Sequence, residues 1–350
     1  MRRWQQRCTL LQRDELMSFA FRLARSAASF ISSSCLAGIA ALLATAAGVG
    51  AAYAAKPEPW QTGFQDAATP VMERIDSFHN LLLIIISLIS VFVLVLLIMT
   101  IVKFRESKNP EPSKTTHNLV LEVAWTIVPV LILVMIAVPS FRLLYYTDKA
   151  PKLTKAEIAK GGRMMAVKAT GHQWYWSYEY NVPNGGKLRF ESRLACRGTI
   201  DADNRKQCEE ADKRFQAKYK RKVVRLLDVD NEMVLPVGAT VRLYVTGADV
   251  IHSWTIPASG AKIDAVPGQT NETWVRFTKA GWYFGQCSEL CGKDHAFMPI
   301  ALRVVTAEQY KAWLAEAWKK AQADSDGFSV VRAPKKTAML KSGVKSAARK

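Results

Sequence analysis

The sequence predicts an α+β membrane protein in which a hairpin of two transmembrane helices precedes a β-barrel domain outside the membrane. Two long apolar runs lie in the first half of the chain. From Met164 onward, short strand-like runs alternate with turn signals. A basic start followed by an uncharged, Ala-rich stretch predicts a signal peptide in front of both parts.

The N-terminal segment has the layout of a secretory signal. Residues 1–25 carry six Arg, residues 26–55 carry no charged side chain, and this stretch ends in A-A-Y-A-A. We therefore expect a signal peptide over residues 1–55, with Met17 as an alternative start. An uncleaved membrane anchor is the other interpretation, and it would leave the topology downstream unchanged.

The two apolar runs are each long enough to cross a bilayer, which takes about 20 residues. Residues 81–102 carry no charge, whereas residues 119–146 carry Glu122 and Arg142 near their ends. The loop between them, residues 103–118, has four Lys or Arg against two Glu, so the positive-inside rule places it in the cytoplasm. Residues 56–80 and the chain beyond the second span are then expected in the periplasm of a bacterial inner membrane.

The outer domain, residues 150–305, is predicted to be an antiparallel sandwich or barrel because strand-like runs recur at short intervals. We expect residues 306–324 to form a helix and the basic tail, residues 325–350, to be disordered. The expected strands are residues 164–171, 174–180, 222–229, 240–247, 252–256, 273–278, 281–287 and 300–305.

A charged insert, residues 189–222, interrupts this pattern with eleven Lys or Arg against six Asp or Glu. It contains Cys196 and Cys208 and no His, which favours a disulfide over a metal site in an oxidising compartment.

The functional prediction rests on the stretch G-Q-C-S-E-L-C-G-K-D-H-A-F-M, residues 285–298. It offers the thiolates of Cys287 and Cys291, the imidazole of His295 and the thioether of Met298, and copper prefers such soft donors. His252, in V-I-H-S-W, can supply a second imidazole.

The number of donors indicates two coppers rather than one. Two metals with four ligands each need eight contacts, and two bridging thiolates supply four of them. His252, His295 and Met298 supply three more, and the backbone carbonyl of Glu289 can supply the eighth. Such a shared pair suits an electron relay. A disulfide within C-x-x-x-C and a structural zinc site are the alternatives, although Met298 at the copper spacing argues against zinc.

These residues resemble the CuA site in subunit II of the haem–copper cytochrome c oxidase family. Residues 63–73, 122–129, 171–180 and 229–236 are similar to that family as well, in its order, and the resemblance covers residues 60–320. It implies a cupredoxin-like Greek-key barrel. It also implies that the chain accepts electrons from cytochrome c at dinuclear copper and passes them to subunit I, where oxygen is reduced to water and protons are translocated.

The resemblance implies roles for three further residues. Trp174 would be the exposed aromatic where electrons enter, and Glu122 would lie at the mouth of a proton path into subunit I. The carboxylate of Glu289 would help to bind Mg²⁺ or Mn²⁺ shared with subunit I. Subunits I and III, cytochrome c and the lipid bilayer are the implied partners. Four acidic residues are expected at loops or strand ends, where they would steer a basic donor: Asp228, Asp230, Asp249 and Asp264.

Other classes are disfavoured. The net charge of +18 is spread over tails and loops without a nucleic-acid-binding motif, and no C-x-x-C-H motif for haem attachment occurs. A copper-less assembly subunit of a quinol oxidase would lack the ligands. A CuA domain serving another reductase, such as nitrous oxide reductase, would not need paired spans. The positive insert favours a neutral or acidic cytochrome as the donor.

Overall fold

The computed structural model describes residues 53–331 apart from residues 112, 156–163, 183–185 and 199–201. The expected signal peptide lies outside these residues except for its last three positions, which form the short strand β1 (Tyr53–Ala55). The expected disordered tail lies outside them from residue 332 onward.

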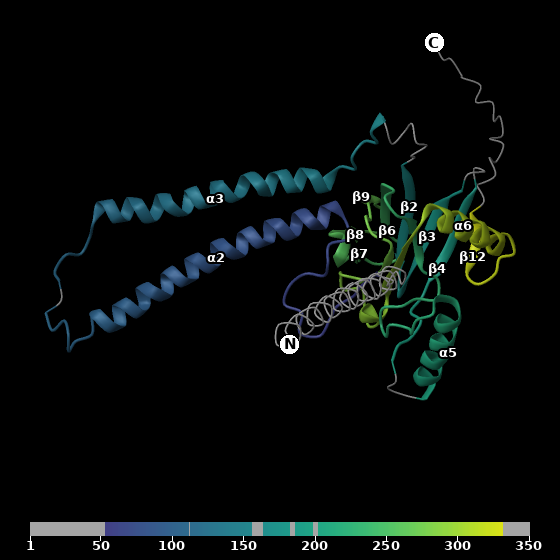
Figure 1. Cartoon of the computed structure of the whole chain (residues 1–350), viewed down its shortest axis with the longest axis horizontal. Helices are drawn as coiled ribbons and strands as arrows, with labels where there is room; N and C mark the ends of the chain where they lie inside the picture. Colours follow the sequence, from purple (N-terminus) through teal and green to yellow (C-terminus); the bar gives the residue numbers. More distant parts are fainter. Residues whose placement is uncertain (1–52, 112, 156–163, 183–185, 199–201, 332–350) are drawn as a thin grey trace, which may run out of the picture. The chain divides into compact units, whose positions relative to one another are not determined.

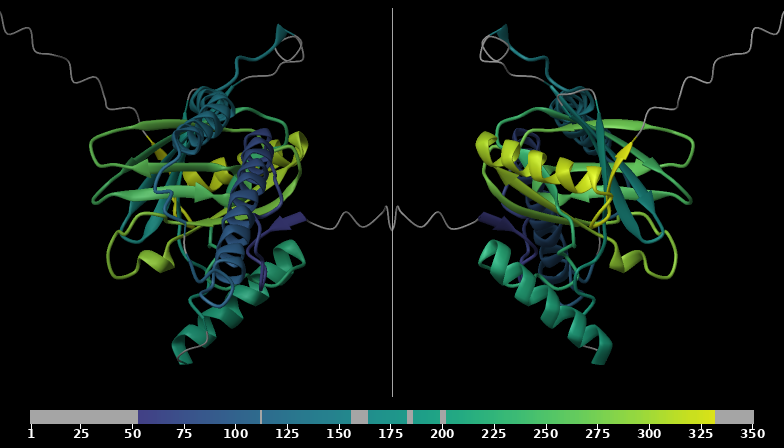
Figure 2. Two further views of the ribbon diagram at one scale, coloured as in Figure 1. Left: turned by 90° about the vertical axis from the view of Figure 1, so that its left-hand side faces the viewer. Right: turned by 90° about the vertical axis from the view of Figure 1, so that its right-hand side faces the viewer.

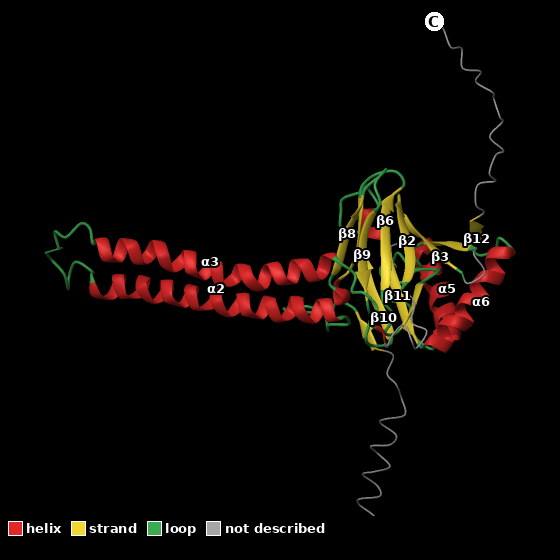
Figure 3. Ribbon diagram, turned by 90° about the horizontal axis from the view of Figure 1, so that it is seen from above, coloured by secondary structure: helices red, strands yellow, loops and turns green. Residues whose placement is uncertain are grey.

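The two apolar runs form antiparallel helices that lie side by side, α2 (Pro70–Lys103) and α3 (Leu119–Asp148) (Figures 1 and 3). α2 begins well before the apolar run because the Thr69 side chain accepts a hydrogen bond from the Met72 N–H and Pro70 suits the first turn. Asn118 caps α3 in the same way. Both helices expose their apolar side chains along the span, as expected of helices in contact with lipid, and the predicted hairpin is confirmed.

Strands from both halves of the outer domain form two main sheets and a separate pair of strands. One sheet has the order β12-β4-β3-β2-β6-β9, the other has the order β1-β10-β11-β5, and β7 pairs with β8. Figure 2 shows the strands of this domain from two opposite sides. The remaining bounds are β2 (Met165–His172), β3 (Tyr175–Asn181), β4 (Lys187–Ser192), β5 (Met233–Pro236), β6 (Val241–Gly247), β7 (His252–Ile256), β8 (Ala261–Ala265), β9 (Asn271–Val275), β10 (Gly281–Gln286), β11 (Pro299–Val305) and β12 (Phe328–Val331).

The β-rich outer domain is confirmed, but its pairing is not purely antiparallel. β2 pairs with β6, β5 with β11 and β1 with β10 in parallel. The core between the sheets is aromatic, and its largest fully buried side chains include Trp176, Tyr178 and Tyr180 of β3 and Trp254 of β7. The Tyr180 hydroxyl both donates to the Val234 carbonyl and lies within hydrogen-bond distance of its N–H, which ties β3 to β5. This packing gives the loops at the end of the barrel a rigid base.

The expected strand over residues 222–229 is wrong. This segment is irregular, with one turn at residues 225–227 and an isolated bridge from Val229 to Leu194. The Asp228 carboxylate stabilises this conformation, because it accepts hydrogen bonds from both terminal nitrogens of Arg221, at 2.6 and 2.7 Å, and from the Val224 N–H. The insert also differs from the expectation. Its first four residues belong to β4, and most of the remainder forms α5 (Ala202–Tyr219), which a disulfide between Cys196 and Cys208 joins to the preceding segment.

The C-terminal segment also contains more structure than expected. α6 (Ala307–Gln322) begins with a capping box formed by Thr306 and Gln309, and its Trp313 ring packs against Tyr180. β12 then pairs with β4 inside the segment that was expected to be disordered. The reason is Phe328, which is buried and stacks on Phe190 with 5.0 Å between ring centroids.

The stacking of Phe328 predicts a measurable contribution to stability. We expect Phe328→Ala to destabilise the outer domain by about 3 kcal/mol, because it empties a buried aromatic site. The measurement is thermal unfolding of the full chain in detergent, with Ser329→Ala as the control on the same strand. Equal melting temperatures for the two variants would show that β12 does not stabilise the barrel.

Candidate metal centre

The candidate metal ligands come from two places that the fold brings together. His252 is the first residue of β7, while Cys287, Cys291, His295 and Met298 lie on the loop between β10 and β11. β10 and β11 pair antiparallel up to Gln286 and Pro299, so both ends of this loop start from a fixed position. We call residues 287–298 the ligand loop.

Gly285 allows the ligand loop to reach His252. A Cβ atom at this position would lie 1.8 Å from the Thr255 carbonyl oxygen, so only glycine permits β10 to lie this close to β7. Three residues further along, the Ser288 N–H donates to the Ser253 carbonyl at 3.0 Å. These contacts place Cys287 beside the His252 ring.

The donor atoms form one cluster centred on the two sulfurs. The Sγ atoms of Cys287 and Cys291 are 3.8 Å apart. Cys287 Sγ lies 3.9 Å from His252 Nδ1 and 3.3 Å from the Glu289 carbonyl oxygen. Cys291 Sγ lies 3.5 Å from His295 Nδ1 and 3.4 Å from Met298 Sδ. The structure therefore brings together all six donors that the sequence singled out.

These separations fit ligands that share metal ions. Donors bonded to one metal at about 2.0–2.3 Å with tetrahedral angles lie roughly 3.3–3.8 Å from each other. A disulfide would need its sulfurs at about 2.05 Å, and both cysteines are free in the structure. Two thiolates, two imidazoles, a thioether and a carbonyl form a soft donor set that suits copper.

The centre is mostly buried, and its surroundings shift the pKa values of the cysteine thiols, whose protons a metal would displace. His252 is fully buried, and Cys287, Cys291 and Met298 are at most 6% exposed. Burial opposes ionisation of Cys287, but several hydrogen bonds, of which that from His252 is the strongest, together outweigh it and lower the pKa of Cys287 to about 7. Burial and the neighbouring Cys287 raise the pKa of Cys291 to about 12. Metal binding would therefore release a proton from Cys291 near neutral pH.

Asp249 orients His252, a role that differs from the one expected of it. Its Oδ1 atom lies 2.8 Å from His252 Nε2, and its two oxygens accept hydrogen bonds from the N–H groups of Val250 and Gln173, both at 2.7 Å. Although partial burial opposes it, the hydrogen bonds from His252, Val250 and Gln173 together lower the pKa of Asp249. A carboxylate on Nε2 directs Nδ1 toward the metal. The spacing D-x-x-H was the available signal in the sequence.

Trp174 packs against the ligand loop and is half-buried rather than fully exposed. Its Nε1–H donates to the Cys291 carbonyl at 3.2 Å, and the Gln173 amide donates to the same oxygen at 2.7 Å. Gly292 permits this packing, because its φ is +120° and a Cβ atom there would lie 3.0 Å from the Trp174 ring. The sequence pattern did not single out Gln173.

The other predicted residues lie elsewhere. Asp228 is fully buried and cannot steer a partner protein, which corrects that expectation, whereas Asp264 is exposed. Asp230 is partly buried, and its carboxylate accepts hydrogen bonds from the N–H groups of Arg193 and Asn231. Glu122 lies in the first turn of α3, at the opposite end of that helix from the barrel.

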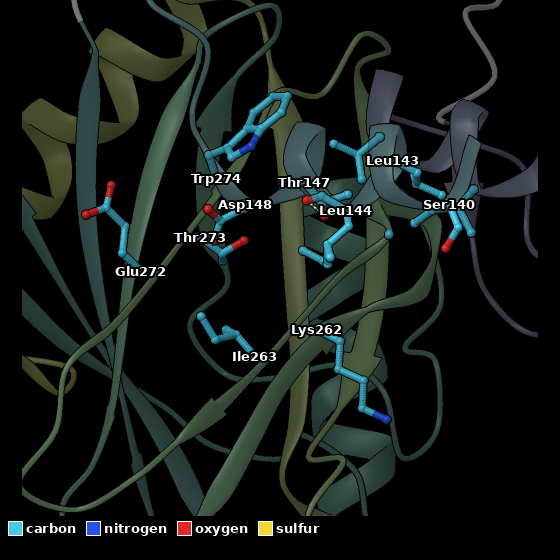
Figure 4. A pocket seen from close by; sticks show the side chains of 14 residues that line it. Ser140, Leu143, Leu144, Thr147, Asp148, Lys262, Ile263, Glu272, Thr273 and Trp274 are labelled. Carbon is cyan, nitrogen blue, oxygen red and sulfur yellow. Dashed lines mark hydrogen bonds between the residues drawn. The ribbon is translucent and has the colours of Figure 1, made fainter. Parts of the chain in front are cut away.

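A cavity of about 480 Å³ lies between the outer end of α3 and strands β8 and β9, and Figure 4 shows it from close by. Leu143, Leu144 and Trp274 line it together with the charged side chains of Lys262 and Glu272. None of the candidate metal ligands lines it, so the cavity is separate from the metal centre.

Comparison with known proteins supports this interpretation of the site. A family model described as cytochrome c oxidase subunit II, periplasmic domain, matches residues 165–305, and one described as the transmembrane domain of the same subunit matches residues 57–143. A probable cytochrome c oxidase subunit 2 of Rickettsia bellii is 43% identical over 269 residues, which cover 77% of this chain and 88% of that protein. Cytochrome c oxidase subunit 2 of Cereibacter sphaeroides is 42% identical over 287 residues, covering 81% and 90%.

A solved structure is similar to the outer domain. The periplasmic domain of subunit II of cytochrome oxidase from Bradyrhizobium japonicum is 46% identical, with a TM-score of 0.36. The match covers 49% of this chain and 99% of that one.

The contact between Asp249 and His252 predicts an effect on metal affinity. We expect Asp249→Ala to lower copper affinity roughly 10- to 100-fold, because the imidazole loses the partner that holds its orientation. The measurement is competition for copper between the full chain and a chelator. The matched control is Asp264→Ala, which removes an exposed carboxylate away from the centre. Equal affinities for both variants would contradict the positioning role of Asp249.

Proposed function

Because this chain belongs to the cytochrome c oxidase subunit II family, we propose a route by which electrons enter the oxidase through it. The chain is a membrane subunit of a haem–copper oxidase, an oxidoreductase complex, and carries a centre of the CuA type. The route runs from cytochrome c to Trp174, then to the ligand loop, and from there to subunit I. The observation that carries the proposal is the convergence of six donor atoms around two free thiols.

We assign the metal ligands residue by residue. Cys287 and Cys291 would hold the metal through their thiolates, His252 and His295 through Nδ1, Met298 through its thioether and Glu289 through its backbone carbonyl. A dinuclear copper centre, when bound, supplies one-electron chemistry in which the electron is shared by both metals. The protein limits movement of these ligands, because β10, β11 and β7 hold the ligand loop at three places. Small movement between redox states favours fast transfer.

Trp174 suits electron entry because its indole is bonded to the ligand loop. Its N–H group donates to the carbonyl of Cys291, whose own sulfur is one of the two central donors. An electron arriving at the indole therefore reaches the centre through one hydrogen bond and one residue. The aromatic side chain also offers a docking anchor for cytochrome c.

The side-chain carboxylate of Glu289 can bind a metal ion other than copper. Its carbonyl lies toward Cys287, while its side chain is exposed at the loop surface. An exposed carboxylate next to a partner subunit is a suitable oxygen ligand for Mg²⁺ or Mn²⁺, and the other ligands would come from subunit I. The EPR signal of manganese in the assembled oxidase measures this occupancy, and no bound manganese or magnesium would contradict it.

We propose that the centre lies on the outer side of a bacterial inner membrane. The basic loop between α2 and α3 favours a cytoplasmic location for that loop, which puts the barrel in the periplasm. Residues 1–55 would act as the signal peptide. Subunits I and III would pack beside the hairpin, and cytochrome c would approach the barrel from the periplasm. Labelling the barrel in intact spheroplasts tests this orientation, because a cytoplasmic barrel would stay unlabelled.

Electron entry at Trp174 predicts a selective kinetic defect. We expect Trp174→Ala to slow reduction of the copper centre by cytochrome c at least about tenfold, because the docking ring and its hydrogen bond are lost together. Stopped-flow mixing of the assembled oxidase with reduced cytochrome c measures the rate, and metal analysis checks that copper content is unchanged. Tyr175→Phe is the control from the neighbouring position. A normal rate in a copper-replete Trp174→Ala enzyme would place electron entry elsewhere.

If Glu122 lies at the entrance of the proton path, replacing it should slow turnover of the oxidase without slowing electron entry. The Glu122 side chain also accepts a hydrogen bond from the Asn118 N–H at 3.3 Å, so it helps to start α3. Glu122→Gln keeps an acceptor for that bond and removes the charge, which separates the two roles. We expect oxygen consumption to fall several-fold while reduction of copper keeps its rate. Unchanged oxygen consumption would leave helix capping as the role of this residue.

A further inference from the structure

The insert packs against the two strands that carry the ligand loop. Arg221, at its end, lies 4.0 Å from the centre of the Trp282 ring of β10 and pairs with the buried Asp228. Tyr219 of α5 meets the same Trp282 ring edge to face and donates a hydrogen bond to Glu232 at 2.6 Å. Trp282 and Ala301 of β11 belong to a small apolar cluster outside the main core, and Tyr219 packs against this cluster. The insert is therefore fixed to the base of the ligand loop.

Arg197 extends this contact to the ligand loop itself. Its Nη2 atom lies 3.3 Å from Asp294 Oδ2, and its guanidinium lies 4.3 Å from the centre of the Phe297 ring. Asp294 and Phe297 stand at the two ends of the single 3₁₀ turn η2 (His295–Phe297), where the Phe297 N–H donates to the Asp294 carbonyl at 2.8 Å. Arg197 thus holds both ends of the turn that carries the ligand His295.

The backbone that precedes Arg197 is also held in place. Cys196 is bonded to Cys208 of α5, and its carbonyl accepts a hydrogen bond from the Leu226 N–H at 3.1 Å. The preceding residue, Ala195, donates to the Asp228 carbonyl at 2.9 Å. The position of Arg197 therefore depends on the disulfide and on the segment around Asp228, not on its own contacts alone.

We propose that Arg197 is a positioning residue for the metal centre, and that the disulfide-bonded insert is the frame that fixes it. Arg197 holds η2 so that His295 faces Cys291 before metal arrives, which lowers the ordering cost of binding and slows metal release. The proposal rests on the copper centre assigned above and adds a function for the insert.

The geometry favours this role over that of an ordinary surface ion pair. The side chain of Asp294 is 23% exposed and that of Arg197 is 41% exposed, so their attraction alone contributes little stability. A planar guanidinium can pair with a carboxylate and stack on a ring at the same time, and an ammonium cannot. The combination constrains the turn from two directions, so its effect should appear in metal retention more than in global stability.

The test compares copper release from variants of the full chain in detergent after loading with copper. Transfer of copper to excess chelator is followed over time, and EPR spectra are recorded before the chelator is added. We expect Arg197→Ala to release copper roughly tenfold faster than the unmodified chain, with an altered EPR spectrum. Arg197→Lys keeps the charge without the stacking and should fall between the two. The double variant Cys196→Ser/Cys208→Ser should also release copper faster.

The matched control is Arg205→Ala, which removes one positive charge from an exposed position of α5 in the same insert. Equal release from Arg197→Ala and Arg205→Ala overturns the inference while leaving the copper centre intact. An unmodified chain that takes up no copper overturns the proposed function and this inference with it. Thermal unfolding of the metal-free variants shows whether they fold. If Arg197→Ala unfolds at a lower temperature than the unmodified chain, the copper release rate of Arg197→Lys is used for the comparison.

Discussion

The candidate metal centre depends on the close approach of β10 to β7. Gly285 makes this approach possible, since any side chain there would collide with the Thr255 carbonyl. The approach brings Cys287 within 3.9 Å of His252, although 35 residues separate them in the chain. Because β10 pairs with β11, the last residue of the ligand loop lies close to its first, and Met298 lies beside Cys291. The site is thus a property of three strands, and its ligands are held by a packed aromatic core.

The candidate ligands, whose donor atoms the structure brings together, could be selected from the sequence because their chemistry is local. Two thiolates, an imidazole and a thioether within fourteen residues restrict the metal by donor type alone, and His252 completes the count. The transmembrane hairpin could be predicted for a similar reason, since twenty uncharged residues have few alternatives to a membrane span. Both predictions depend on which residues are present in a short stretch of sequence, and not on which distant residues they contact.

The features that the sequence did not reveal depend on contacts between residues that are far apart in the chain. Asp249 supports His252, and Gln173 binds the Cys291 carbonyl, only after separate loops converge. Residues 222–229 have the apolar character of a strand, but the pairing of Arg221 with the buried Asp228 holds them in an irregular segment with one turn. The C-terminal segment forms β12 because Phe328 stacks on the Phe190 ring of β4. In each case a long-range contact overrides the local pattern.

The central claim is that the two thiols share a pair of copper ions, and copper counting with EPR tests it most directly. The full chain, purified in detergent and loaded with copper, should hold two copper ions per chain. Its spectrum should show one unpaired electron coupled equally to two copper nuclei. One copper ion per chain with coupling to a single nucleus, or a preference for zinc over copper, would contradict the account.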